Sequence, residues 1–197
     1  MEKKMTFNQY RAMDLAIFTV LTVVFEYVAT LATSKWFWGQ PVAISITLTL
    51  ILITTHRWGA YAAVVAAAGG VAFCLASGAS WEHYLIYAVG NVFALVSLVY
   101  FRIFGKEDVK NSFLKTLLFA ATSYLSVALG RWIVSLIFGA GFGELIAFLT
   151  TDLITLLFAV VILYSCKSVD GLIEDQKKYI IRVNEEKKQT DTVSYDD

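Results

Sequence analysis

Long runs of apolar residues fill most of the chain between Leu15 and Cys166, and short polar segments separate them. A helix needs about 20 mostly apolar residues to cross a membrane. The runs therefore predict an all-α integral membrane protein with six transmembrane helices in one membrane domain, residues 15–166. The second and third runs are together too long for a single crossing. The six expected helices are Leu15–Ser34, Pro41–Thr55, Trp58–Gly78, Glu82–Phe101, Phe113–Phe138 and Glu144–Cys166.

Basic residues in the short segments predict the orientation of these helices, because such residues collect on the cytosolic side. Of the 16 Lys and Arg residues, all but Lys35 and Arg131 fall on the side that also holds both ends of the chain. We therefore expect both termini in the cytosol. Residues 1–14 would be a cytosolic N-terminal segment, and residues 167–197 a cytosolic tail.

The tail is polar, with apolar residues at helical spacing. We expect a short amphipathic helix in it, followed by a disordered acidic end over Gln189–Asp197. The positions that share one face of this expected helix are Val169, Leu172, Ile173, Gln176, Ile180 and Val183.

Composition supports the membrane assignment. The chain is 58% hydrophobic and 16% charged, whereas soluble domains carry about 25% charged residues. The formal net charge is zero, so the chain lacks the basic excess that marks a nucleic-acid-binding protein.

Arg131 lies deep in the apolar run Phe113–Phe138. A guanidinium in the membrane is costly without a partner and is a functional-site hypothesis by default. Glu26, Asn91 and Asp152 are expected at a similar depth, roughly 10–15 Å below the outer surface. Either these residues line a substrate pocket open to the outside, or Arg131 pairs with Glu26 or Asp152 only to fix helix packing. Two carboxylates for one guanidinium favour the pocket, since one carboxylate needs another partner.

Aromatic residues gather where the expected helices meet the outer face. Trp36 and Trp38 follow the first helix, and Trp81 and Tyr84 begin the fourth. They are typical of an interfacial aromatic belt, and they could also form a lid over a ring-shaped ligand. We include them in the candidate substrate site for that second reason.

Sequence motifs of enzymes are missing. There is no P-loop, no G-x-S-x-G and no H-E-x-x-H motif, so we expect neither catalysis nor ATP hydrolysis by this chain. His56 and His83 are predicted on opposite sides of the membrane, which disfavours a shared metal site. We expect no cofactor.

Two short elements resemble a known family. Ala12-Met-Asp-Leu-Ala16 is similar to an A-x-x-x-A element in the first helix, and Arg57-Trp-Gly59 leads into a glycine- and alanine-rich helix. With its length and helix count, the chain resembles the substrate-binding S components of energy-coupling factor (ECF) transporters, which are small bacterial or archaeal membrane proteins. The resemblance covers the chain from Arg11 to the end of the last expected helix.

The resemblance implies a function. Such a protein binds a vitamin or related micronutrient from outside, beneath the loop that follows the first helix. It then docks on a membrane T component through the small-residue face of that helix, here Ala12 and Ala16, and two ATPase subunits energise uptake. The alternative is a non-catalytic membrane scaffold of the cell-shape or cell-wall machinery, which would also be small, helical and free of enzyme motifs.

Overall fold

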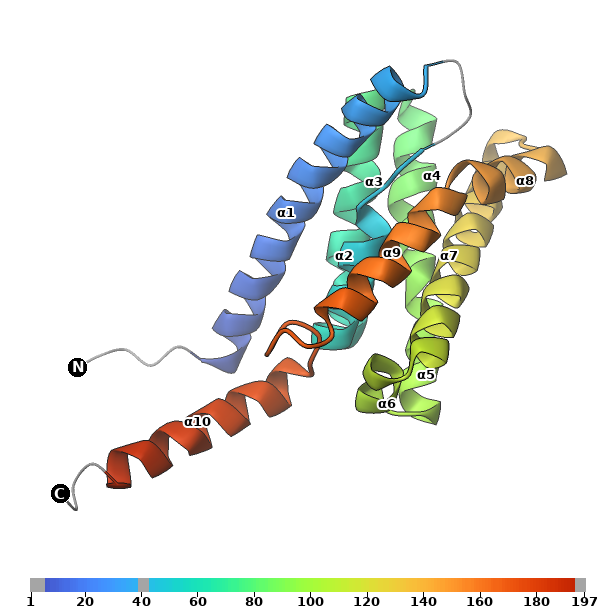
Figure 1. Cartoon of the computed structure of the whole chain (residues 1–197). Helices are drawn as coiled ribbons and strands as arrows, with labels where there is room; N and C mark the ends of the chain where they lie inside the picture. Colours follow the sequence, from blue (N-terminus) through green and yellow to red (C-terminus); the bar gives the residue numbers. More distant parts are fainter. Residues whose placement is uncertain (1–5, 39–42, 194–197) are drawn as a thin grey trace.

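The computed structural model of the protein describes residues 6–38 and 43–193, with side chains as far as Glu186. Its regular structure in these residues is entirely helical (Figure 1). The α-helices are α1 (Phe7–Trp36), α2 (Thr47–Trp58), α3 (Ala63–Ser77), α4 (Trp81–Val92), α5 (Val99–Ile103), α6 (Lys106–Asn111), α7 (Phe113–Ser135), α8 (Phe142–Thr151), α9 (Leu153–Cys166) and α10 (Gln176–Val193), joined in places by the short 3-10 helices η1 (Gly59–Ala62), η2 (Phe93–Leu98) and η3 (Leu136–Phe138).

Within the described residues, four helical stretches are long and apolar enough to cross a membrane, and a bent pair of helices makes up to five. The prediction of an apolar, all-helical protein is therefore confirmed, with fewer spans by length and composition than the six expected. The bent pair is α8 with α9, and it bends by 43°. The other stretches are Phe7–Trp36, Thr47–Ser77, Trp81–Ile103 and Phe113–Phe138.

The stretch Thr47–Ser77 contains a reversal of the chain. Gly59 has a φ of +61° and ends α2, and α3 then runs back along α2 until Gly69 lies against Thr47. A β-carbon added at Gly69 would come within 2.3 Å of the Thr47 side chain. The second expected helix was placed from Pro41, which lies outside the described residues. Ala43–Ile46 are not helical, and α2 begins at Thr47.

Glycines allow the central helices to approach closely. A β-carbon added at Gly90 of α4 would lie 2.7 Å from the backbone of Arg131 in α7. A β-carbon at Gly130 would lie 2.7 Å from the carbonyl oxygen of Gly90, so the two glycines face each other. Gly70 of α3 meets the backbone of Tyr87 in the same way. In apolar surroundings such small residues let helix backbones touch, and here they bring α3, α4 and α7 together.

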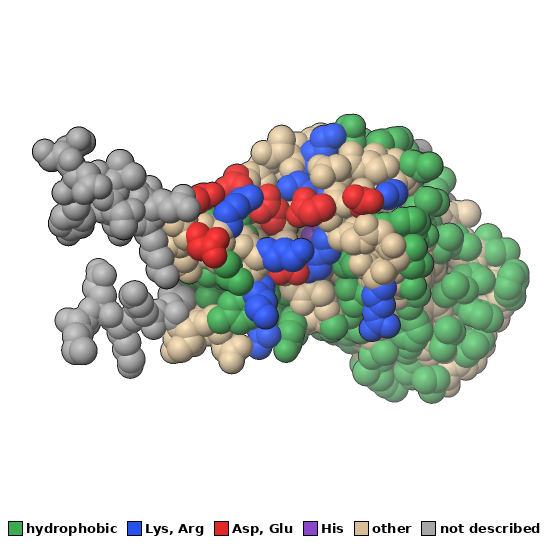
Figure 2. Space-filling model, turned by 90° about the horizontal axis from the view of Figure 1, so that it is seen from below, with side chains coloured by type: hydrophobic (Ala, Val, Ile, Leu, Met, Phe, Trp, Pro, Cys, Tyr) green, Lys and Arg blue, Asp and Glu red, His purple; other side chains and the backbone are tan. Residues whose placement is uncertain are grey.

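The first turn of α1 lies at the lower end of the bundle as drawn in Figure 1, with α5, α6 and α10. Acidic and basic side chains gather on this face (Figure 2). The predicted amphipathic helix of the tail starts later than expected, at Gln176, because Lys167–Asp175 form turns. Val169 is half exposed, whereas Ile173 is buried. Helix α10 continues to Val193, into the part that was expected to be disordered, and residues 194–197 lie outside the described residues.

Candidate functional site

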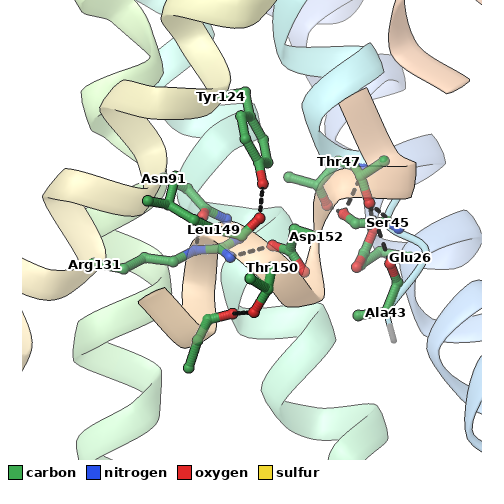
Figure 3. Close-up of polar contacts among 12 residues, drawn as sticks. Glu26, Ala43, Ser45, Thr47, Asn91, Tyr124, Arg131, Leu149, Thr150 and Asp152 are labelled. Atoms are coloured by element: carbon green, nitrogen blue, oxygen red, sulfur yellow. Dashed lines mark hydrogen bonds and ion pairs between the residues drawn. The ribbon is translucent and has the colours of Figure 1, made fainter. Parts of the chain in front are cut away.

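Arg131 joins three helices near the upper end of the bundle. Its Nε donates a hydrogen bond to Asn91 Oδ1 of α4 over 2.9 Å, and its Nη1 donates to Asp152 Oδ2 over 2.5 Å (Figure 3). The guanidinium also lies over the ring of Tyr87, 4.4 Å from the ring centre. Arg131 is 6% exposed. Asn91 and Asp152, which were expected at a similar depth, therefore both contact Arg131, and Asp152 is the carboxylate that pairs with it.

Asp152 occupies the break between α8 and α9, which the sequence did not predict. The break frees backbone carbonyl groups of α8, and in an apolar bundle these need other partners. The hydroxyl of Tyr124 donates to the carbonyl oxygen of Leu149, and the N–H of Ala43 donates to that of Thr151 over 3.0 Å. The bend therefore leaves these carbonyls satisfied and turns the Asp152 carboxylate toward α7.

Glu26 is bonded to the start of α2 rather than to Arg131. One of its oxygens, Oε2, accepts hydrogen bonds from the backbone N–H groups of Ile46 and Thr47 over 2.9 and 3.0 Å. The same oxygen accepts from the hydroxyl groups of Ser45 and Thr47 over 2.8 and 2.9 Å. Glu26 thus caps the N-terminus of α2, where a negative charge is stabilised by the helix dipole. The second carboxylate does find another partner, and that partner is a helix end.

A cavity of about 200 Å³ lies between these two clusters. Its charged lining residues are Glu26, Arg131 and Asp152, and Phe73 and Tyr87 supply an aromatic wall. The hydroxyl oxygen of Thr30 is buried beside it and has no hydrogen-bond partner among the described residues. A space with charged, aromatic and unsatisfied polar groups can hold a small polar molecule.

A second cavity, of about 400 Å³, lies on the other side of Tyr87 and Asp152, which line both spaces. It is bordered by α4, α7, η3 and α8. Glu82, His83 and Glu144 lie along it. Tyr87 and Asp152 therefore form the partition between two neighbouring cavities.

The remaining candidates from the sequence lie apart from these spaces. Trp36, Trp38 and Trp81 are 77%, 90% and 66% exposed and line neither cavity, and the half-buried Tyr84 does not line them either. The exposure of the three tryptophans fits the aromatic-belt interpretation. Asn91 reaches the site through its hydrogen bond to Arg131.

Sequence reasoning missed Thr30, Phe73 and Tyr87. The only signal for two of them was spacing: Tyr87 precedes Asn91 by four residues and Thr30 follows Glu26 by four, so each pair shares a helical face. No such signal pointed to Phe73.

Ala12 and Ala16, the candidate partner-binding residues, are both exposed on α1. Between them, the Asp14 carboxylate accepts hydrogen bonds from Arg57 Nη2 over 2.7 Å and from Trp58 Nε1 over 2.5 Å. The two elements that carry the family resemblance are therefore joined to each other. Arg57 also donates to the carbonyl oxygens of Gly171 and Leu172, which ties the start of the tail to the same cluster.

Among the described residues, no group of three or more His, Cys, Asp or Glu side chains is placed to hold a metal ion. Comparisons of this chain with protein-family models, with curated proteins and with solved structures gave no match.

Proposed function

We propose that this protein is the substrate-binding membrane subunit of an ECF-type importer, taking up a vitamin or related micronutrient in a prokaryotic cell membrane. The observation that carries the proposal is the cavity of about 200 Å³ lined by Glu26, Arg131 and Asp152. Charged groups inside an apolar bundle are costly, and a cavity among them gives them a use that packing alone does not.

The proposal includes a six-crossing topology with both termini in the cytosol. Ala43–Ile46 together with α2 would make the second crossing, since α2 has only 12 residues. The reversal at Gly59 makes α3 the third crossing, and bent α8 and α9 make the sixth. The face that Figure 2 shows, which is the lower end of the bundle in Figure 1, would then be cytosolic. Its Lys and Arg residues are in keeping with this side of the membrane.

Energy for uptake would come from separate subunits, a membrane T component and two ATPases. The exposed Ala12 and Ala16 offer the T component a face without bulky side chains, next to exposed Met13 and Ile17. Asp14, held by Arg57 and Trp58, fixes the position of this face relative to α2.

One observation favours the alternative, a membrane scaffold without a ligand. Arg131 is paired with Asp152, and Glu26 caps α2, so these charges already have protein partners. On this view they would only hold the helices together, and the cavity would have no occupant.

Mass spectrometry of the small molecules released from the purified, detergent-solubilised protein separates the two functions. The wild type should release one organic compound in stoichiometric amount. Arg131→Met should release none while eluting as a folded monodisperse protein, because Arg131 holds Asp152 and Tyr87 in place in the cavity wall. Arg102→Met, which changes an exposed arginine at the other end of the bundle, is the matched control and should retain the compound.

The wild type should also be melted with a panel of water-soluble vitamins. A protein that releases nothing and gains no thermal stability from any of them would refute the proposed importer function. If the wild type releases no compound and Arg131→Met has a lower melting temperature, the result would support the scaffold.

A further inference from the structure

The charges around the first cavity do not balance. Arg131 and Asp152 form an ion pair with an N–O distance of 2.5 Å, and their side chains are 7% and 15% exposed. They neutralise each other at the partition between the two cavities. Glu26 is left as the third charged group on the cavity wall, and no second Lys or Arg is among the lining residues described.

Glu26 has one oxygen to spare. All four of its hydrogen bonds reach Oε2, and in the described part of the chain none reaches Oε1. The N-terminus of α2 supplies a positive charge of only about half a unit. A carboxylate held by four donors at one oxygen thus keeps net negative charge, with its other oxygen available for a further donor.

The second cavity is also lined by negatively charged residues. Its acidic lining residues are Glu82, Glu144 and Asp152, and its described lining includes no Lys or Arg. His83 is held by the hydroxyl of Ser80, 2.8 Å from Nδ1. Clefts lined by charges of one sign raise the local concentration of ligands of the opposite sign and speed their association. The wider space would therefore draw a cation toward the partition at Tyr87 and Asp152.

The cavity wall also suits a flat cationic group. Phe73 and Tyr87 stack with their ring centres 4.5 Å apart, and both line the first cavity. The Arg131 guanidinium already lies over the Tyr87 ring, so Phe73 is the ring that remains to attract a ligand cation. A volume of about 200 Å³ is smaller than the roughly 300–1,000 Å³ of sites for drug-sized ligands, which limits the occupant to about one ring with its substituents.

From these features we infer that the ligand of this site is a small organic cation, an amine, an amidine or a positively charged nitrogen heterocycle, whose N–H or positive edge meets Glu26 Oε1. The inference rests on the proposed binding function and narrows its substrate class. We expect the cation to collect first in the second cavity, with Glu82 and Glu144, which shares Tyr87 and Asp152 with the first.

Three probes of equal size and different charge test this inference by isothermal titration of the detergent-solubilised protein. Benzamidine is cationic, benzamide is neutral and benzoate is anionic. Benzamidine should bind at least about ten-fold more tightly than the other two, since a hydrogen bond between charged groups contributes about 1.5–3 kcal/mol. Glu26→Gln should remove most of that preference, whereas Glu185→Gln, at an exposed position of α10, should not change it.

A second variant keeps the test independent of the folding of Glu26→Gln. Glu144 is exposed at the rim of the wider cavity, so Glu144→Gln should slow benzamidine association at low salt and leave its dissociation rate unchanged. Preferential binding of benzoate or benzamide that Arg131→Met abolishes would overturn the cation inference and leave the binding function standing. If none of the three probes binds and no compound is released from the purified protein, both proposals fall.

Discussion

Removing the partner of Arg131 should destabilise the protein more than any other single charge removal in the site. In Asp152→Ala the guanidinium stays 6% exposed and keeps only Asn91 and the Tyr87 ring as partners. Breaking a buried ion pair by removing one side costs about 3–5 kcal/mol. For a chain of this size, each kcal/mol shifts the melting temperature by roughly 2–4 °C, so we expect a fall of about 6–20 °C.

The assay is thermal denaturation of ligand-free protein in detergent, followed by tryptophan fluorescence, with a double-mutant cycle. In Asp152→Ala/Arg131→Met both charges are gone, and the hydrogen bond to Asn91 and the contact with the Tyr87 ring are lost in addition, at about 1 kcal/mol each. The double variant should therefore melt above Asp152→Ala, with Glu185→Ala as an exposed control. A shift of 2 °C corresponds to about 1 kcal/mol. If Asp152→Ala melts within 2 °C of the wild type, or if the double variant melts no higher than Asp152→Ala, the ion pair does not stabilise the fold by the expected amount of about 3–5 kcal/mol.

Three further outcomes are expected. Gly90→Ala should lower the melting temperature by several degrees, because its β-carbon would lie 2.7 Å from the α7 backbone and overpacking costs about 1–3 kcal/mol; Gly143→Ala, with nothing within 4 Å, should not. Arg57→Ala should speed cleavage of the tail by trypsin under native conditions, because the carbonyls of Gly171 and Leu172 lose their hydrogen bonds to Arg57 and only that of Gly171 keeps a donor, Gln176; unchanged cleavage would mean that the tail is held by other contacts. Burial acts to raise the pKa of Asp175, but the hydrogen bond and charge of Lys106 lower that pKa below its ordinary value. The stabilisation of the folded protein by the ion pair of Lys106 and Asp175 should be present above about pH 4 and be lost as the pH falls through the lowered pKa of Asp175. It should stay under about 1 kcal/mol because the pair is partly exposed, and it should be smaller in Lys106→Met melted over the same pH range, where only the backbone N–H groups of Lys177 and Lys178 still lower the pKa of Asp175.

The expected helix Phe113–Phe138 coincides with α7 and η3, because polar residues flank a mostly apolar run. The first helix was expected from Leu15 but begins at Phe7. The depth argument also placed Arg131, Asn91 and Asp152 at one level, since helix rise alone fixes how far a residue lies from a helix end.

Other features depended on contacts between residues far apart in sequence. Glu26 decides where α2 starts, because it accepts the N–H groups of Ile46 and Thr47, 20 and 21 residues later. The bend at Asp152 is stabilised by Tyr124 and Ala43 from other elements. No local pattern carries that information. Arg131 pairs with Asp152, while Glu26, on the wall of the same cavity, accepts the N–H groups at the start of α2; the sequence leaves this choice open.

The Arg57 cluster also has a consequence for the order of events during synthesis. Asp14 and Arg57 are 43 residues apart, so they can pair early in translation. Gly171, the other acceptor that Arg57 needs, follows 114 residues later. At about 5–20 residues per second, that interval lasts roughly 6–23 s. During this time the guanidinium has a carboxylate but lacks its carbonyl acceptors, and a chain that stops short of Leu172 never completes the cluster. A segment synthesised 114 residues after Arg57 thus closes the structure around one of the earliest helices to be made.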